Sequence, residues 1–334
     1  MLLKSKLKRI IASALFGDPH QFLTLRKMRD KTFILMYHRV LYYGDKEQVF
    51  VQPGIYVSQN TFRKHIEFLK TNFKILFLDE LLQRIENGKN IDGCCSITFD
   101  DGWNDNFTNA YPVIKEYQVP ATIFLATNYI GNNKVFWPEE LCFYLKLTQN
   151  KWEYLPKSIK KQYEREIISK INEDKLLDNI IENVKKLNPD ERENILEKLR
   201  IVSPIKSLPK LLIDWNEARI MVDSGLINFG AHTANHVILD QVSLQQAEQE
   251  IVQSRQHIED QLGIQVNYFA YPNGNFNKDI KKLLKRIGFK GAVTTQKKLI
   301  DEKVSLFEIP RIGMHDDVSN SIPLFIARIL TKRF

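Results

Sequence analysis

Short apolar runs alternate along this chain with longer segments of helical periodicity, and this alternation restricts the fold more than any other feature. Residues 33–38, 94–99 and 121–126 are such runs, with the continuous apolar character of buried strands. Ser58 is placed to cap a helix whose apolar positions follow at helical spacing. Strands that alternate with helices in this way predict a parallel sheet or barrel.

The same pattern continues through most of the chain. The helix that follows residue 243 has the clearest signals, because Ser243 and Gln246 form a capping-box pattern and Gly263 marks its end. We therefore expect a distorted (β/α)7-type barrel of about seven strands. The remaining expected strands are 75–78, 227–230, 268–270 and 291–294, and the remaining helices are 81–86, 110–117, 215–224 and 279–287.

The alternation stops at about residue 139 and resumes at about residue 212. Segments 157–172 and 190–199 in this interval are rich in Lys and Glu, poor in glycine and helical in periodicity. We interpret 139–212 as a helical insertion in a main domain of residues 31–334, with its exit near 204–209. We expect it to act as a lid or side lobe at the mouth of the site.

Residues 1–30 form a basic N-terminal segment. Lys4, Lys6, Lys8 and Arg9 precede the seven apolar residues 10–16, too few to cross a bilayer. Two interpretations remain open: an amphipathic helix on a membrane surface, or a helix packed on the domain itself. The segment lacks a clear export signal, so we expect a cytoplasmic protein at the inner face of the membrane.

The net charge of +8 favours anionic partners, but charge alone is weak support for nucleic-acid binding. The sequence contains no zinc-finger or RNA-binding signature, so we expect no nucleic-acid partner. The three cysteines show no CxxC spacing, and nothing in their pattern requires an oxidising compartment. The oligomeric state is left open by the sequence.

Two groups of polar residues follow predicted strands. Asp100 and Asp101 end the run 94–99, where adjacent carboxylates are costly unless a cation compensates them. His232 and His236 follow the predicted strand 227–230, and two imidazoles four residues apart can converge on one ion. Strand ends are also where ligands bind in such folds, so the two groups together predict a metal centre.

These segments resemble the motifs of the polysaccharide deacetylase family, also called the NodB-homology or carbohydrate esterase family 4 fold. The similar segments appear in a fixed order and cover most of residues 31–316, leaving the insertion outside. They are ILMYHRV at 34–40, TFDDG at 98–102, VPATIFL at 119–125, GAHTANH at 230–236, FAYPNG at 269–274 and PRIGMHD at 310–316.

The resemblance implies a role for each matching residue. Asp101, His232 and His236 would bind a divalent metal, usually Zn²⁺. Asp100 would be the base that deprotonates the attacking water. The third motif would place Asn273 so that its backbone N–H stabilises the oxyanion, with the neighbouring Tyr271 as a further contact with the substrate or oxyanion.

The third motif departs from the family pattern, since many members carry Arg-x-Pro-Tyr where this chain has residues 270–273 as AYPN. A similar form occurs in the branch with poly-N-acetylglucosamine deacetylases. We expect Arg311 to supply the missing positive charge. His315 is the predicted general acid, and His38 is a second candidate or a substrate contact. Trp103 is a candidate for stacking on a sugar ring, with core packing as the alternative.

We therefore expect a metal-dependent hydrolase of carbon–nitrogen bonds, other than peptide bonds, that removes N-acetyl groups from an acetamido sugar. Its partner would be an acetylated polysaccharide, oligosaccharide or lipid-linked glycan. An O-acetyl esterase or a non-sugar amidase could use the same metal centre. A catalytically impaired glycan-binding protein is a third possibility, which the missing third-motif arginine favours and the complete set of metal and base residues opposes.

Overall fold

The computed structural model divides the chain into two compact units, which we call the barrel unit and the helical unit. The barrel unit is Met1–Tyr42, Gly54–Asn132 and Leu212–Phe334, and the helical unit is Tyr43–Pro53 and Asn133–Leu211. The residues that the structure describes are 2–17, 26–42, 51–52, 54–147, 155, 157, 160–161, 173–203, 208–301 and 303–331.

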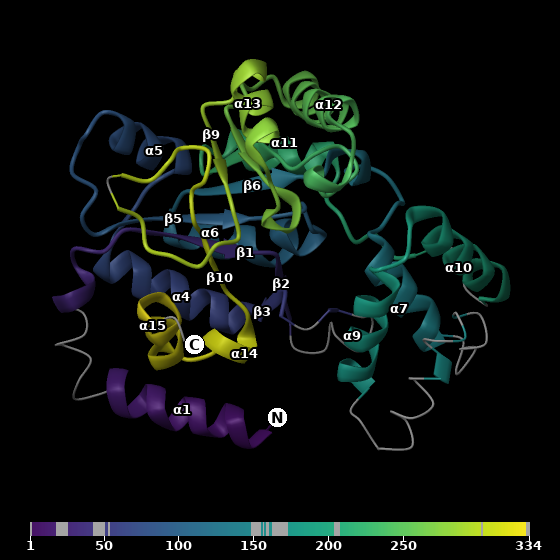
Figure 1. Cartoon of the computed structure of the whole chain (residues 1–334). Helices are drawn as coiled ribbons and strands as arrows, with labels where there is room; N and C mark the ends of the chain where they lie inside the picture. Colours follow the sequence, from purple (N-terminus) through teal and green to yellow (C-terminus); the bar gives the residue numbers. More distant parts are fainter. Residues whose placement is uncertain are drawn as a thin grey trace. The chain divides into compact units, whose positions relative to one another are not determined.

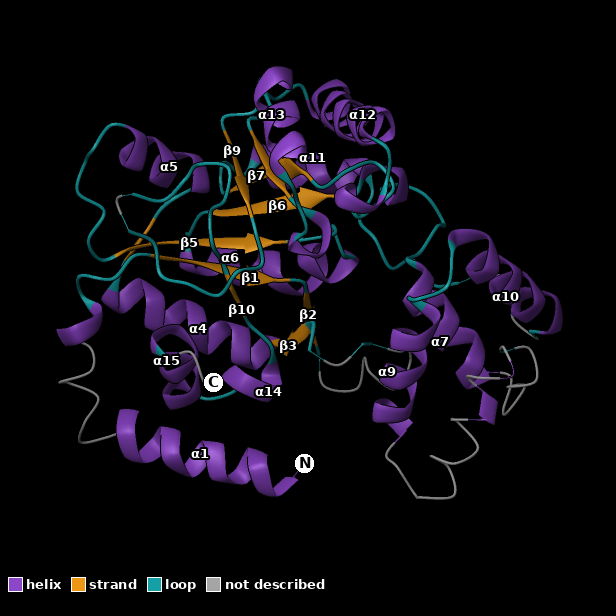
Figure 2. Cartoon of the chain, viewed as in Figure 1, coloured by secondary structure: helices purple, strands orange, loops and turns teal. Residues whose placement is uncertain are grey.

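A curled parallel sheet forms the centre of the barrel unit (Figure 2). Seven of its strands are hydrogen-bonded in the order β10-β1-β5-β6-β7-β8-β9, and a short strand β4 pairs with β5. Ile309 donates its backbone N–H to Ala292 of β9 and accepts from the backbone N of Thr294, which links the far edge to the segment that leads into β10. The strands are β1 (Phe33–Tyr37), β4 (Lys74–Ile75), β5 (Cys94–Phe99), β6 (Ala121–Leu125), β7 (Ile227–Ala231), β8 (Tyr268–Ala270), β9 (Gly291–Val293) and β10 (Ile312–Gly313).

Helices surround this sheet, and a second, two-stranded sheet lies beside it (Figure 1). The second sheet pairs β2 (Arg39–Leu41) with β3 (Tyr56–Ser58). The helices are α4 (Gln59–Asn72), α5 (Leu78–Glu86), α6 (Tyr111–Tyr117), α11 (Trp215–Asp223), α12 (Leu244–Leu262), α13 (Lys278–Ile287), α14 (Asp316–Ser319) and α15 (Ile322–Leu330). Short helical turns η1 (Asn106–Ala110), η2 (Thr127–Tyr129), η4 (Leu239–Gln241) and η5 (Pro272–Gly274) complete the unit.

The strand register brings the polar segments to one edge of the sheet. Tyr37 pairs with Phe99, and Leu125 pairs with Ala231, so β1, β5, β6 and β7 end close to one another. Gly230 lets β7 lie close to the Phe124 side chain, because a Cβ at that position would lie 2.5 Å from the ring of Phe124. The residues that follow β1, β5 and β7 therefore meet at the carboxyl ends of the strands, where parallel folds bind ligands.

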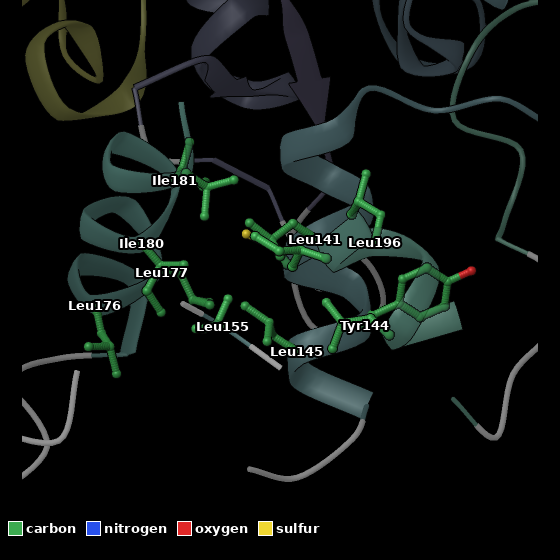
Figure 3. Packing of buried hydrophobic residues seen from close by; sticks show 13 residues of the cluster. Leu141, Tyr144, Leu145, Leu155, Leu176, Leu177, Ile180, Ile181 and Leu196 are labelled. Atoms are coloured by element: carbon green, nitrogen blue, oxygen red, sulfur yellow. The ribbon is translucent and has the colours of Figure 1, made fainter. Parts of the chain in front are cut away.

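The helical unit contains α7 (Trp137–Leu147), α9 (Glu173–Val184) and α10 (Pro189–Val202). Asn188 begins α10 with a capping box to Glu191, and Pro189 occupies the first turn. Figure 3 shows the unit's core, which is built from aliphatic side chains and Tyr144. The apolar positions of α9 are spaced for a single buried face, namely Leu177, Ile180, Ile181 and Val184.

The N-terminal helix α1 (Leu2–Phe16) packs against α15 within the barrel unit (Figure 1). Ala12 is fully buried against Leu324 and Ala327, and Phe16 packs on the same cluster. On the rest of the helix, Ile10 and Leu15 remain 65% and 55% exposed. Within the described part of the chain, no helix has the length and apolar character needed to cross a membrane.

The expected barrel with a helical insertion is confirmed, and most predicted elements agree with the structure to within a residue or two at each end. The expected strand 75–78 is wrong in extent: β4 ends at Ile75, and Leu78 already begins α5. Leu244, the first residue of α12, is 48% exposed. The predicted helix 157–172 and the exit near 204–209 fall largely outside the described residues.

Candidate metal centre and active site

Asp100 lies directly after β5 and is 2% exposed. Its carboxylate accepts two hydrogen bonds from Arg311, with Nη1–Oδ1 and Nη2–Oδ2 distances both 2.7 Å. Arg311 is fully buried and also donates to Thr98 Oγ1 and to the Thr294 carbonyl. Paired donors on a planar guanidinium fix both oxygens of a carboxylate, so Asp100 is held in one orientation.

The charge on Asp100 is stabilised despite its burial. Burial by itself raises the pKa of this carboxyl, but the guanidinium of Arg311 and the imidazoles of His232 and His38 outweigh it. The net effect is a pKa below the usual value for aspartate. Asp100 is therefore a carboxylate at neutral pH, and it can accept a proton.

Asp101 presents one carboxylate oxygen to two histidines. Its Oδ1 lies 3.5 Å from His232 Nε2 and 3.4 Å from His236 Nε2, and this buried oxygen has no hydrogen-bond partner among the described residues. The backbone of Asp101 adopts φ +77°, which is rare outside glycine and is followed by φ +86° at Gly102. This turn aims the carboxylate at the imidazoles.

His232 follows β7 and is 2% exposed. Its Nδ1 lies 2.7 Å from the carbonyl oxygen of Ala270, which fixes the ring with Nε2 toward Asp101. His236 has φ +55° and brings its own Nε2 to the same point. The potential ligand atoms of Asp101, His232 and His236 all lie within 4.8 Å of one another, as a three-residue metal site requires.

The segment between the two histidines is held by Glu250, which the sequence did not single out, and by Asn128. The buried Glu250 of α12 accepts hydrogen bonds from the backbone N and side-chain Nδ2 of Asn235, at 2.7 and 2.8 Å. The amide of Asn128, just past β6, donates to Asn235 Oδ1. No local motif marks Glu250, because its contact spans 15 residues and depends on how α12 packs on β7.

His38 lies beside this group. It follows β1, and its backbone carbonyl accepts a 2.7 Å hydrogen bond from Asn106. The carbonyl of Tyr37, directly before it, accepts a 3.0 Å hydrogen bond from the backbone N of Asp100. The structure therefore brings His38 to the same edge as the carboxylate pair.

His315, the predicted general acid, has different surroundings. Its Nδ1 lies 3.5 Å from Asp317 Oδ2, and its carbonyl accepts a hydrogen bond from the hydroxyl of Ser319, the last residue of α14. Asp316, the residue after His315, accepts a hydrogen bond from the backbone N of Ser58. The described contacts of His315 involve α14 and not the Asp101 cluster, so its role stays a prediction.

Two residues that were predicted to contact the substrate are buried in the structure. Trp103 is 1% exposed and donates through Nε1 to Asp101 Oδ2 at 2.9 Å, which agrees with the alternative of core packing. Tyr271 is fully buried, stacks on Phe276 and donates its hydroxyl to the Phe307 carbonyl. In both positions an apolar ring completes the packing under the site. Asn273 lies in η5 with φ +57°, and its part in binding an oxyanion stays a prediction.

Several known proteins are similar to this chain. The YxkH protein of Bacillus subtilis (strain 168), named for the polysaccharide deacetylases, is 21% identical over 290 residues, which cover 86% of this chain and 73% of YxkH. A poly-beta-1,6-N-acetyl-D-glucosamine N-deacetylase of Staphylococcus epidermidis is 34% identical over 120 residues. That match covers 32% of this chain and only 40% of the staphylococcal protein.

Solved structures share the fold. IcaB from Ammonifex degensii superposes with a TM-score of 0.59 at 16% identity, covering 90% of this chain and 98% of IcaB. The Streptococcus pyogenes deacetylase PplD gives a TM-score of 0.57 at 18% identity, covering 87% of this chain and 95% of PplD. At such identities the likeness supports the barrel architecture alone.

The family model described as polysaccharide deacetylase matches residues 87–292, more than half of the chain. The match includes Asp100, Asp101, His232 and His236, which the structure gathers at one edge of the sheet. Members of this family are hydrolases that remove acetyl groups from glycans. This chain belongs to the polysaccharide deacetylase family.

Proposed function

We propose that this protein is a metal-dependent hydrolase that removes N-acetyl groups from acetamido sugars in a glycan. One observation carries the proposal: adjacent aspartates face different partners. Asp100 is bound by Arg311, whereas Asp101 presents a free oxygen to His232 and His236. The first arrangement suits a fixed base, and the second suits a metal ligand.

The residues present fit a divalent metal. An unpartnered, buried carboxylate oxygen that faces two imidazole nitrogens is costly without a cation between them. One carboxylate and two imidazoles form a ligand set that suits zinc, and three protein ligands leave a position open. We propose Zn²⁺ as the ion. When bound, it would polarise the acetyl carbonyl and lower the pKa of the attacking water.

The chain's own residues would then move the protons. Asp100 would take a proton from the attacking water at its carboxylate, and Arg311 would keep that carboxylate oriented and charged before the transfer. Arg311 lies directly before β10, so the positive charge comes from a strand other than the one that carries the third motif.

We propose His38 in place of His315 as the group that protonates the leaving nitrogen. His38 directly follows Tyr37, whose carbonyl accepts a 3.0 Å hydrogen bond from the backbone N of Asp100, whereas the described contacts of His315 are on α14. His38→Gln should lower turnover about 100-fold or more, because a positioned acid contributes on the order of 10²–10⁴. His315→Gln is the control, and a larger loss for His315→Gln would reverse the assignment.

An acetamido sugar is the substrate class that the relatives favour. The staphylococcal relative is named for poly-beta-1,6-N-acetyl-D-glucosamine, and the matched segment covers 40% of it. Acetate release from defined N-acetylated oligosaccharides tests the proposal, with O-acetylated sugars in parallel. Release from esters alone would establish the esterase alternative, and zinc binding without any release would establish a glycan-binding protein.

We further propose that α1 attaches the protein to an anionic membrane surface. Ile10 and Leu15 are exposed although α1 packs on α15 through Ala12. The chain carries Lys4, Lys6, Lys8 and Arg9 and no acidic residue before Asp18, so the segment complements anionic headgroups. This location would suit a lipid-linked glycan.

Co-sedimentation with phosphatidylglycerol vesicles tests the membrane proposal. The wild-type chain should bind these vesicles and bind phosphatidylcholine vesicles weakly, since apolar and electrostatic terms act together. Ile10→Glu with Leu15→Glu should abolish binding, whereas Ile220→Glu on α11, also at an exposed position, should not. Equal binding of the double variant and the control would refute the proposal.

A further inference from the structure

A line of buried contacts leads from the candidate metal centre to the start of the second sheet. Trp103 donates from Nε1 to Asp101 Oδ2 at 2.9 Å. The guanidinium of Arg39 lies over the Trp103 ring, 4.5 Å from its centroid. Arg39 Nε in turn donates to Asp105 Oδ2 at 2.9 Å, and Asp105 Oδ1 accepts from the backbone N of Val40 at 2.7 Å.

This line is closed to solvent at every step. Trp103 is 1% exposed, and Arg39 and Asp105 are each 5% exposed. A buried guanidinium needs a partner of opposite charge, which for Arg39 is Asp105. The same ion pair fixes the orientation of the guanidinium over the Trp103 ring. The ring of Trp103 is therefore held between the cation and the metal-ligand carboxylate.

The indole N–H is the only donor of a tryptophan side chain, and in Trp103 it donates to one oxygen of Asp101. The other oxygen, Oδ1, is buried, has no hydrogen-bond partner among the residues that the structure describes, and faces His232 and His236. The two oxygens of this carboxylate thus have separate surroundings. Rotation of the carboxylate to present both oxygens to one ion would break the bond to Trp103.

We propose that Trp103 is a positioning residue that makes Asp101 a one-oxygen ligand, with Arg39 and Asp105 holding the indole in place. The proposal rests on the metal centre proposed above. A carboxylate that bound through both oxygens would occupy a coordination position that a hydrolytic centre keeps for water or substrate. Neighbours that orient a ligand in this way typically change metal affinity by about 10–100-fold when removed.

Trp103→Phe tests the proposal, because it keeps an aromatic ring and removes the N–H. Trp215→Phe is the matched control, since Trp215 begins α11 and contacts His257. We measure Zn²⁺ affinity by competition with a chelator, the visible spectrum of the Co²⁺ form and the thermal midpoint of the metal-free chain. Trp103→Phe should weaken Zn²⁺ binding about tenfold or more. Its Co²⁺ absorption should weaken as the coordination number rises, while the metal-free midpoint moves no more than in the control.

A second variant covers the case in which Trp103→Phe folds poorly. Arg39→Gln leaves the indole in place and removes the cation over it, so Zn²⁺ affinity should fall by a smaller factor, and Trp215→Phe should again show no loss. Wild-type affinity and Co²⁺ spectrum in a folded Trp103→Phe or Arg39→Gln chain would overturn the positioning role. A wild-type chain that bound neither ion would overturn the metal centre itself, and the positioning role with it.

Discussion

The carboxyl edge of the barrel and the core of the helical unit bury opposite kinds of side chain. At the barrel edge, Asp100, Asp101, His232 and Arg311 are buried together with their charges and hydrogen bonds. The core of the helical unit consists of Leu, Ile and Val side chains with Cys142 and Tyr144 (Figure 3). The buried side chains of the barrel edge are polar or charged, whereas those of the helical core are almost all apolar.

The two regions serve different purposes: the barrel edge carries the residues proposed for catalysis, and the helical core stabilises its own unit. Buried charges are costly and persist only where each has a partner, so the barrel edge depends on complete pairing. The helical core depends on apolar area and packing alone, and similar side chains can replace one another there. Removal of one side chain at the barrel edge should therefore affect metal binding or activity, whereas removal of one side chain in the helical core should affect stability alone.

The largest effect on stability is expected from Arg311→Met. This change leaves Asp100 buried without its counterion, and breaking a buried pair in this way costs about 3–5 kcal/mol. Urea unfolding at neutral pH measures the loss. Arg63→Met is the control, because Arg63 pairs with Glu116 on the surface and such pairs contribute about 0–1 kcal/mol. Equal losses in the two variants would show that burial of the Arg311 pair does not matter.

A somewhat smaller effect is expected in the helical unit. Leu177 of α9 is 1% exposed, and Leu177→Ala should cost about 2–5 kcal/mol through lost contacts and a cavity. Hydrogen exchange should speed up in α9 and α10 while zinc affinity is unchanged. Ile201→Ala, at a 71% exposed position on α10, should change stability by about 0.5 kcal/mol or less. Loss of zinc binding in Leu177→Ala would contradict the separation of chemistry from stability.

The pH dependence of stability should show the effect of a third buried group, the imidazole of His65. Burial lowers the pKa of His65 to about 4, although its Nε2 lies 2.6 Å from the Ser319 carbonyl. Between pH 6.5 and 4 the unfolded chain binds a proton that the folded chain does not, so acid favours unfolding. Above pH 6.5 the ionisation of His65 does not reduce the free energy of unfolding. As the pH falls from 6.5 to 4, that free energy falls by about 1.4 kcal/mol per pH unit. His65→Gln should flatten the profile there, and an unchanged slope would rule out this source.

The fold followed from local periodicity, and the metal cluster followed from position. Apolar runs locate the strands, and a parallel sheet necessarily brings Asp100, Asp101 and His232 to one edge. The predicted contact between Arg311 and Asp100 is present in the structure, although 211 residues separate them. Periodicity could not predict which individual side chains are buried, because burial depends on segments that are distant in the sequence.

His65 illustrates that limit. It lies on α4, where α15 covers it, and Phe325 stacks on its ring with the ring centroids 4.0 Å apart. Trp103 follows the same logic, because only the folded chain places Arg39 over its indole. Tertiary contacts determine the burial of such side chains, so their surroundings are poorly predicted from a single sequence.

The division of labour between the adjacent aspartates is tested most directly by Zn²⁺ titration and acetate release on Asp100→Asn and Asp101→Asn. Asp100→Asn should bind zinc as the wild type does, within about threefold, and release acetate about 10²–10⁴ times more slowly. Asp101→Asn should lose zinc affinity and activity together, because it removes the charged oxygen that faces both histidines. Loss of zinc binding in Asp100→Asn, or wild-type zinc affinity in Asp101→Asn, would contradict the assignment of base and ligand.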